Sequence, residues 1–184
     1  MGVSSIFGRV TTPHSGRWRV GAAATLAIGV SLGAVMATAP RVLINTTTSE
    51  PPGLYVRSPM APGPGHIVAF TAPAAAFPYA DRRLSYLHRM PLLKAVAAGP
   101  GDLVCTLNGK LEIDGRARAP IAQVDRQGFT LPHWSACRRL TADELFVFSD
   151  RVPNSFDSRY FGPVHRRAVL AVYVPLAVLT SGGR

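Results

Sequence analysis

The feature that most restricts this chain is an uncharged stretch near its N-terminus. Between Arg19 and Arg41 lie twenty-one residues, VGAAATLAIGVSLGAVMATAP, without a charged side chain. A helix needs about 20 apolar residues to cross the hydrocarbon core of a bilayer. We therefore predict a transmembrane helix over residues 20–40, which separates an N-terminal segment, 1–19, from a domain that comprises residues 41–184.

The charges before this stretch predict its orientation. The first nineteen residues contain Arg9, Arg17 and Arg19 and no acidic side chain. Positively charged segments stay on the cytoplasmic side of a membrane. We expect a cytoplasmic N-terminus, with the domain from Arg41 onward on the outer side.

A cleaved signal peptide is the alternative interpretation. Ala37-Thr38-Ala39 has the small-x-small form of a cleavage site. The apolar stretch is longer than the ~7–15 residues of a signal-peptide core. The residue after Ala39 is Pro40, whose ring and missing N–H suit a scissile position badly. These two features favour an uncleaved anchor.

The strong positive charge raises the question of a nucleic-acid partner. The net charge is +10, and the basic residues are eighteen arginines and two lysines. The arginines are scattered singly or in pairs, and the domain is expected outside the membrane, so we predict no nucleic-acid partner. A basic surface near anionic inner-membrane lipids is the simpler account.

The two cysteines, Cys105 and Cys137, both belong to the outer domain. An exported compartment is oxidising, so we expect them to form a disulfide. A metal site would need more ligands at closer spacing. The sequence thus predicts neither a metal nor a cofactor.

Local patterns predict a mainly β domain. The segment LVCTLNGKLEIDG, residues 103–115, places two β-prone runs around Asn108-Gly109, a strong hairpin signal. Turn-forming residues predict loops, and 73–91 looks irregular or partly helical. The expected strands are 66–72, 144–150 and 168–179, the last either buried or lying against the membrane, and the expected loops are 41–57 and 59–65. We predict one compact, mainly antiparallel β domain.

Lys94 is the unusual residue of this domain. It lies within MPLLKAVAAGPGD, residues 90–102, among apolar and small neighbours, in a chain that has eighteen arginines and only two lysines. A buried ammonium is costly, but lysine can lose its proton when desolvated, whereas arginine cannot. A neutral amine can act as a general base towards a serine hydroxyl.

Ser49 is the candidate nucleophile. It precedes Pro51-Pro52-Gly53, which restrict the backbone, and it lies nine residues beyond the predicted helix. An oxyanion needs hydrogen-bond donors, and we consider the Ser49 N–H and the Thr47 hydroxyl. Other interpretations stay open: Thr47 bonded to its own backbone, or Lys94 paired with Asp102. None of the five histidines has a partner at a telling spacing.

Four segments, taken in order, resemble the type I signal peptidases of the serine–lysine class, and within them the conjugative-transfer branch, TraF. These are SEPPGLY (49–55), PGHIVAF (64–70), LLKAVAAGPGD (92–102) and SDRVPNSFDSRYFGPV (149–164). Two departures from the general pattern are Glu50-Pro51-Pro52 after the serine and His66 in place of an aspartate. These two departures leave open whether the protein accepts general secretory precursors as substrates.

The resemblance implies a role for each matched residue. Ser49 would be the nucleophile and Lys94 the base, with Ser155 hydrogen-bonded to the amine. Asp157 and Arg159 would form an ion pair beside the site. Asp157 would be functionally required, as in TraF-like enzymes, although a purely structural pair is equally compatible.

The resemblance also implies a biological setting. The protein would be a single-pass protein of the bacterial inner membrane with a periplasmic serine endopeptidase domain. It would cleave a pilin-type or other membrane-tethered precursor, and the family also allows cyclisation of the product. A non-enzymatic assembly component and a broad-specificity signal peptidase are the alternatives.

Overall fold

The computed structural model describes residues 39–179, which lie in one compact unit that begins at Ala39. Within this range, no helix is long and apolar enough to span a membrane. The predicted segment 1–19 and nearly all of the predicted transmembrane helix, 20–40, lie outside the described residues. Both therefore stay predictions.

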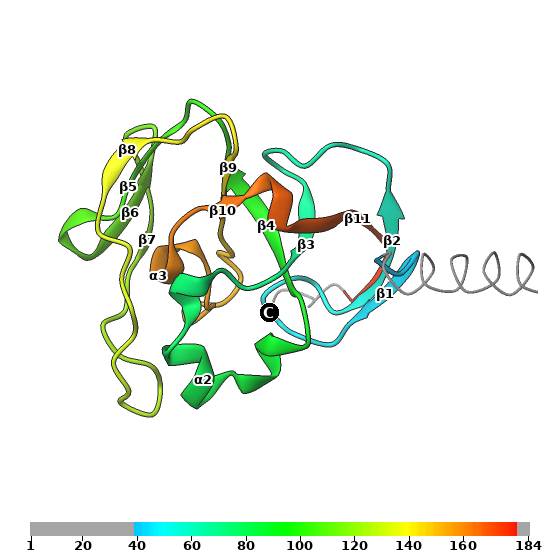
Figure 1. Cartoon of the computed structure of the whole chain (residues 1–184), viewed down its shortest axis with the longest axis horizontal. Helices are drawn as coiled ribbons and strands as arrows, with labels where there is room; N and C mark the ends of the chain where they lie inside the picture. Colours follow the sequence, from blue (N-terminus) through cyan, green and yellow to red (C-terminus); the bar gives the residue numbers. More distant parts are fainter. Residues whose placement is uncertain (1–38, 180–184) are drawn as a thin grey trace, which may run out of the picture. The chain divides into compact units, whose positions relative to one another are not determined.

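Two antiparallel sheets form the described part, which confirms the mainly β prediction. The larger has the order β1-β2-β11-β3-β4-β9-β10, and the smaller has the order β7-β6-β5-β8 (Figure 1). The strands are β1 (Val42–Asn45), β2 (Gly53–Ser58), β3 (Ile67–Phe70), β4 (Leu92–Ala98), β5 (Leu103–Cys105), β6 (Lys110–Ile113), β7 (Arg116–Pro120), β8 (Cys137–Arg139), β9 (Glu144–Val147), β10 (Val164–His165) and β11 (Val169–Val178).

The prediction of a loop over residues 41–57 was wrong in part. Its two flanks are β1 and β2, which pair with each other, and only residues 46–52 form the connection. The prolines interrupt the sheet only at the turn, because β-branched and aromatic residues flank it on both sides. Gly53 opens β2 at φ +149°, where an added Cβ would lie 2.3 Å from the Ala177 carbonyl oxygen.

The apolar run 168–179, which was predicted to be either a buried strand or a stretch lying against the membrane, contains strand β11. β11 lies between β2 and β3 in the larger sheet. Its centre, 171–173, is buried, with Val172 and Tyr173 in the core, whereas residues 175–177 are exposed. Pro175 is tolerated because the register shifts between Pro175 and Ala177.

The predicted hairpin around Asn108-Gly109 is present, and both residues have positive φ. β5 pairs with β6, but a short 3₁₀ turn over Leu107–Gly109 makes the connection longer than two residues. The tight two-residue turn is instead Asp114-Gly115, which joins β6 to β7 at the pair Ile113 and Arg116. The Asp-Gly signal for that turn was present in the sequence and was overlooked.

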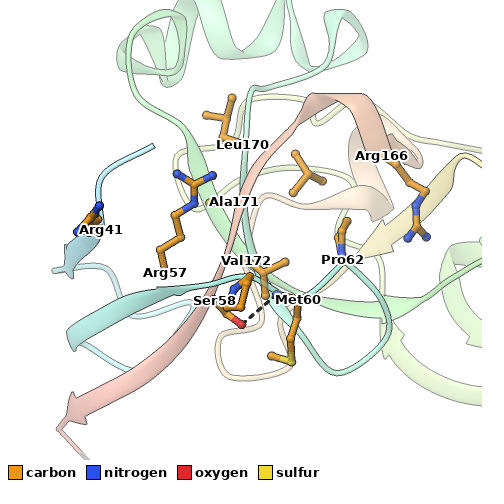
Figure 2. A pocket seen from close by; sticks show the side chains of 11 residues that line it. Arg41, Arg57, Ser58, Met60, Pro62, Arg166, Leu170, Ala171 and Val172 are labelled. Carbon is orange, nitrogen blue, oxygen red and sulfur yellow. Dashed lines mark hydrogen bonds between the residues drawn. The ribbon is translucent and has the colours of Figure 1, made fainter. Parts of the chain in front are cut away.

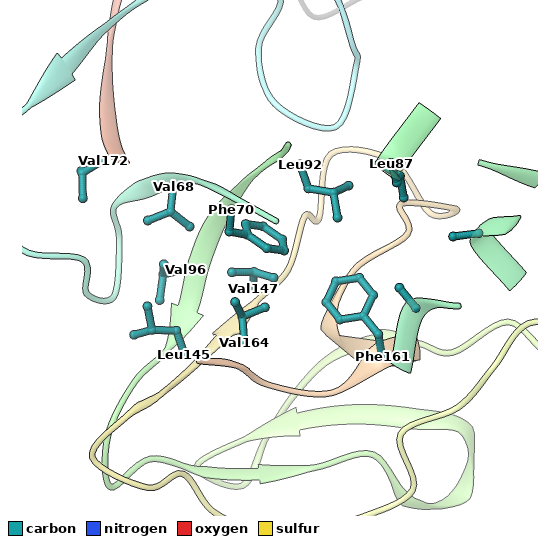
Figure 3. Close-up of a cluster of buried hydrophobic side chains, with 12 residues drawn as sticks. Val68, Phe70, Leu87, Leu92, Val96, Leu145, Val147, Phe161, Val164 and Val172 are labelled. Carbon is teal, nitrogen blue, oxygen red and sulfur yellow. The ribbon is translucent and has the colours of Figure 1, made fainter. Parts of the chain in front are cut away.

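Two hydrophobic clusters meet at β9. Leu145 and Val147 belong to the cluster under the larger sheet (Figure 3), whereas Phe146 and Phe148 face the cluster shared with the smaller sheet. A strand that is buried on both faces lacks the usual polar alternation. The segment 145–148 is therefore apolar throughout, and it fixes the position of the residues that follow it.

Short helices complete the unit. α2 (Tyr79–Arg83) and two 3₁₀ turns occupy the region that was predicted to be partly helical. α3 (Ser158–Phe161) is one turn long and entirely buried. Cys105 and Cys137 face each other across β5 and β8 and form the predicted disulfide.

Candidate active site

Ser49 lies in the connection between β1 and β2, residues 46–52, here named the Ser49 loop. Asn45, at the end of β1, organises it. The buried Asn45 amide nitrogen donates to the carbonyls of Thr47 (3.1 Å), Glu50 (3.0 Å) and Pro51 (3.1 Å). Its amide oxygen accepts from both the N–H and the hydroxyl of Thr47. One side chain thus replaces the sheet hydrogen bonds that the loop lacks.

Two further contacts fix the Ser49 loop to the rest of the domain. The buried Ser149 hydroxyl donates to the Ser49 carbonyl. On the other side of Ser49, the Glu50 carboxylate accepts from the Ala95 N–H at 2.8 Å. Ala95 is the residue that follows Lys94, so the loop is held within one residue of the lysine.

Lys94 projects from β4 toward the core. Buried and partly exposed residues alternate along this strand, and Lys94 falls on the same face as Leu92 and Val96. Its side chain is only 4 % exposed, although it carries an amine. Because successive side chains of a strand point to opposite faces, Lys94 lies on the buried face among apolar neighbours, which is the apolar environment that the prediction required.

Ser155 holds the amine. Lys94 Nζ donates to Ser155 Oγ at 3.0 Å, in a buried hydrogen bond between residues sixty-one positions apart. The alternative partner, Asp102, is engaged elsewhere, because its carboxylate accepts from the Gly99 N–H at 2.8 Å and closes the turn after β4. The predicted contact between Lys94 and Ser155 is present in the structure.

Asp157 and Arg159 form a fully buried ion pair. Arg159 Nε donates to Asp157 Oδ1 at 2.8 Å and Arg159 Nη2 donates to Asp157 Oδ2 at 3.0 Å. Asp157 also caps α3, and Arg159 Nη2 donates to the Ser155 carbonyl at 3.0 Å. The pair therefore fixes the backbone of the residue that holds Lys94.

Burial lowers the pKa of Lys94 below its ordinary value of 10.5, and the positive charge of Arg159 lowers it further. The carboxylates of Asp157 and Glu50 act in the opposite direction. Burial raises the pKa of Glu50, while its hydrogen bond from Ala95 and the charge of Lys94 lower it. Desolvation is the largest influence on both groups.

The hydrogen bonds of Ser49 and Thr47 complete the description of the Ser49 loop. Within residues 39–179, no hydrogen bond joins Ser49 Oγ to Lys94 Nζ. The Ser49 N–H makes no hydrogen bond to any residue of this range either. The Thr47 hydroxyl donates to Asn45 Oδ1 at 2.7 Å. A hydroxyl has one hydrogen to donate, so Thr47 serves the loop in this arrangement. Its role as a second oxyanion donor stays a prediction.

Two cavities lie away from this arrangement. One, of about 590 Å³, runs along β11 and carries the basic residues Arg41, Arg57 and Arg166 (Figure 2). The other, of about 290 Å³, lies beside Tyr79 and Tyr160. Neither Ser49 nor Lys94 lines either cavity, so we assign neither to the chemistry.

Known proteins share this sequence pattern. The family model described as "Signal peptidase, peptidase S26" matches residues 17–176. The chain belongs to signal peptidase family S26. The match extends over β1 to most of β11 and includes both Ser49 and Lys94.

Three known proteins are similar to this chain. The plasmid transfer protein TraF of Escherichia coli is 31% identical over 143 residues, which cover 72% of this chain and 81% of TraF. The conjugal transfer protein TraF of Agrobacterium tumefaciens (strain 15955) is 32% identical over 157 residues, covering 72% and 80%. The structure of a signal peptidase I from Enterococcus faecalis V583 aligns with a TM-score of 0.38 at 20% identity, covering 62% of this chain and 98% of the other.

Sequence reasoning missed three residues of this S26 site. Asn45, Glu50 and Ser149 all hold the Ser49 loop, and none was assigned a role. Asn45 alone had a local signal, because an asparagine before a polar loop commonly bonds the backbone that follows. Ser149 lies one hundred residues from its partner, and no spacing rule predicts such a contact.

Proposed function

We propose that the chain is a membrane-anchored serine endopeptidase that removes the leader or propeptide of an exported pilin-type precursor during conjugative transfer. The observation that carries this proposal is the buried amine of Lys94. It is oriented by Ser155 and desolvated by the core of the larger sheet. A few apolar neighbours and one neutral hydrogen-bond partner are what a lysine general base needs.

The proposed reaction is acyl transfer. Ser49 Oγ attacks the carbonyl carbon of the scissile peptide while Lys94 Nζ takes the hydroxyl proton. The ammonium then gives this proton to the leaving amine, and an ester between Ser49 and the substrate remains. Water, activated by Lys94 in the same way, releases the new carboxylate.

The developing oxyanion requires donors held in place before the reaction. The Ser49 N–H is the first candidate, since it has no other partner within residues 39–179. Asn45, Ser149 and Glu50 fix the backbone that carries it. The Thr47 hydroxyl is the second candidate, once it is released from Asn45.

The substrate class is inferred from two sources. The relatives named above are called plasmid transfer and conjugal transfer proteins, which favours a conjugative system. The short connection between the predicted membrane helix and Ser49 favours a substrate cut close to the bilayer, because nine extended residues reach at most about 30 Å.

Mass spectrometry of a co-expressed pilin precursor tests the proposal, in membranes that carry wild-type, Ser49→Ala or Lys94→Arg protein. We expect only the wild type to shorten the precursor. A product lighter by about 18 Da would identify cyclisation, because the substrate's own amine would then replace water as the acceptor of the acyl group. Identical products with all three proteins would overturn the peptidase assignment for that precursor and favour a non-enzymatic role.

A further inference from the structure

Glu50 follows the proposed nucleophile, and its side chain is buried. Only 4 % of the residue is exposed, although it lies in a polar connection beside exposed Thr47 and Thr48. A glutamate is rarely buried to this extent unless something pairs with it. The environment of Glu50 therefore indicates a specific role.

The hydrogen bond from Ala95 shows what Glu50 replaces. β4 pairs with β3 over Leu92–Ala95, but with β9 only from Val96 onward. The backbone N–H of Val96 donates to the His66 carbonyl and the Val96 carbonyl accepts from the Gly65 N–H, both on the β3 side of β4. The backbone groups of the preceding residue, Ala95, therefore point to the β9 side. There its carbonyl accepts from the Phe148 N–H, and its own N–H donates to Glu50 Oε1. The carboxylate occupies the place of the carbonyl that a longer β9 would supply.

The charges around the amine distinguish Glu50 from the other acid nearby. Asp157 and Arg159 belong to the segment 149–164 and are joined by two hydrogen bonds. After burial, the Asp157 carboxylate is the largest influence on the pKa of Lys94, which it raises, and Arg159 lowers that pKa by less. Glu50 faces Lys94 from the Ser49 loop, and its further charged neighbours are Asp150 and Arg151, of opposite sign. Glu50 is therefore a second negative charge, after Asp157, that favours the protonated amine of Lys94, and within residues 39–179 it forms no salt bridge of its own.

We propose that Glu50 is a positioning residue of the site: its carboxylate fixes the Ser49 loop on β4 and stabilises the ammonium formed when Lys94 accepts the Ser49 proton. This inference rests on the proposed peptidase function. It assigns to Glu50 a supporting part without direct contact with the substrate, through its charge and its hydrogen bond to β4 rather than through a hydrogen bond to the amine.

Two substitutions separate the two halves of this role. Glu50→Gln keeps an oxygen that can accept from the Ala95 N–H but removes the charge. Because the Glu50 carboxylate raises the pKa of Lys94, its removal lowers that pKa, and the acid limb of the pH–rate profile moves to lower pH. The plateau rate falls, because the ammonium in the transition state loses its counter-charge.

Glu50→Ala removes both the charge and the hydrogen bond. We expect a loss of about 10²-fold in kcat, the scale of effect for a displaced reacting group. Glu112→Ala, in β6 of the smaller sheet, is the matched control and should leave the rate and pH profile unchanged. Cleavage of the precursor is measured against a Ser49→Ala blank. Wild-type rate and pH profile in Glu50→Ala would overturn the proposal.

Amide hydrogen exchange tests the positioning independently of activity. The Ala95 amide should be protected in the wild type and in Glu50→Gln, and should exchange faster in Glu50→Ala while the amides of β9 stay protected. If wild-type protein cleaves no better than Ser49→Ala, the peptidase proposal fails, and Ala95 exchange decides the positioning alone. Equal Ala95 protection in Glu50→Ala and wild type would show that Glu50 does not hold the loop.

Discussion

Two buried pairs of opposite charge lie close together in this domain, and they are built differently. Asp157 and Arg159 are joined by two hydrogen bonds, and the Arg159 guanidinium also donates to the backbone carbonyls of Pro120 and Ser155. Lys94 and Glu50 are joined by no hydrogen bond, because the amine donates to Ser155 and the carboxylate accepts from Ala95. The first pair is saturated with hydrogen bonds. The second leaves the amine with neutral contacts, which lets it exchange a proton.

This difference separates support from chemistry. A buried ion pair stabilises its surroundings only when its geometry satisfies both partners, as in Asp157 and Arg159. A base must instead be held without being saturated, so that its neutral form is accessible. The saturated pair holds the Ser155 carbonyl, and Ser155 holds the amine, so one pair positions the other.

The largest expected effect comes from Lys94→Arg. Arginine retains the charge but cannot act as a base, so the cleavage rate should fall by about 10²–10⁴-fold. For the wild type, the rate should rise with pH as Lys94 loses its proton and then level off. This rise lies below 10.5, since burial lowers the pKa of Lys94.

The only other lysine provides the control for this substitution. Lys110 is exposed in β6, and Lys110→Arg should process the precursor at the wild-type rate. Initial rates of precursor shortening, with thermal unfolding to confirm that each variant folds, give the comparison. Near-normal processing by Lys94→Arg would exclude the lysine as the base.

The next largest effect concerns the saturated pair. Arg159→Met leaves the Asp157 carboxylate buried without its partner, which should lower the free energy of unfolding by about 3–5 kcal/mol. The partly exposed pair of Arg138 and Glu144 is the matched control. Arg138→Met should cost at most about 1 kcal/mol. Denaturant unfolding of the two variants measures the difference, and equal losses would mean that burial does not distinguish these pairs.

The same contrast shows how much of the site the sequence could predict. The apolar neighbours of Lys94 predicted its burial, because they are adjacent to it in the sequence and can be read without knowing the fold. The contact of Lys94 with Ser155 followed only from the family resemblance, and the roles of Glu50 and Ser149 followed from neither source. Their partners lie 45 and 100 positions away, so the sheet topology, rather than any local pattern, determines them.

The fold shows a similar limit. Strands with a clear β-prone pattern, such as β3 and β9, were predicted, whereas β1 and β2 were hidden by the prolines between them. Proline and glycine mark where a chain turns, but not how far the turn extends. The Ser49 loop is shorter than its composition suggested, and this is why Asn45 can hold most of it.

Removal of the disulfide in the smaller sheet should have a smaller effect than the substitutions above. The disulfide between Cys105 and Cys137 closes a loop with a sequence separation of 32. Replacing both cysteines by serine should lower the free energy of unfolding by about 2–4 kcal/mol. Cleavage per folded molecule should stay at the wild-type level, because neither cysteine contacts the Ser49 loop or β4 through a hydrogen bond. A large loss of activity in folded protein would show that the two sheets are coupled.

The smallest expected effect is that of Thr47→Val, which asks whether this residue belongs to the support or to the chemistry. Its hydroxyl donates to Asn45 Oδ1, and loss of one such hydrogen bond costs about 0.5–1.5 kcal/mol. The matched variant Thr46→Val alters an exposed neighbour that makes no side-chain hydrogen bond within residues 39–179.

Two outcomes separate the two roles of Thr47. If Thr47 only holds the loop, the cleavage rate of Thr47→Val should fall less than about tenfold, in line with the energy of one hydrogen bond. If it donates to the oxyanion, the loss should reach about 10²–10³-fold in kcat, with unfolding nearly unchanged. Because the hydroxyl already has its acceptor, we expect the smaller loss, which would leave the Ser49 N–H as the principal oxyanion donor of the loop.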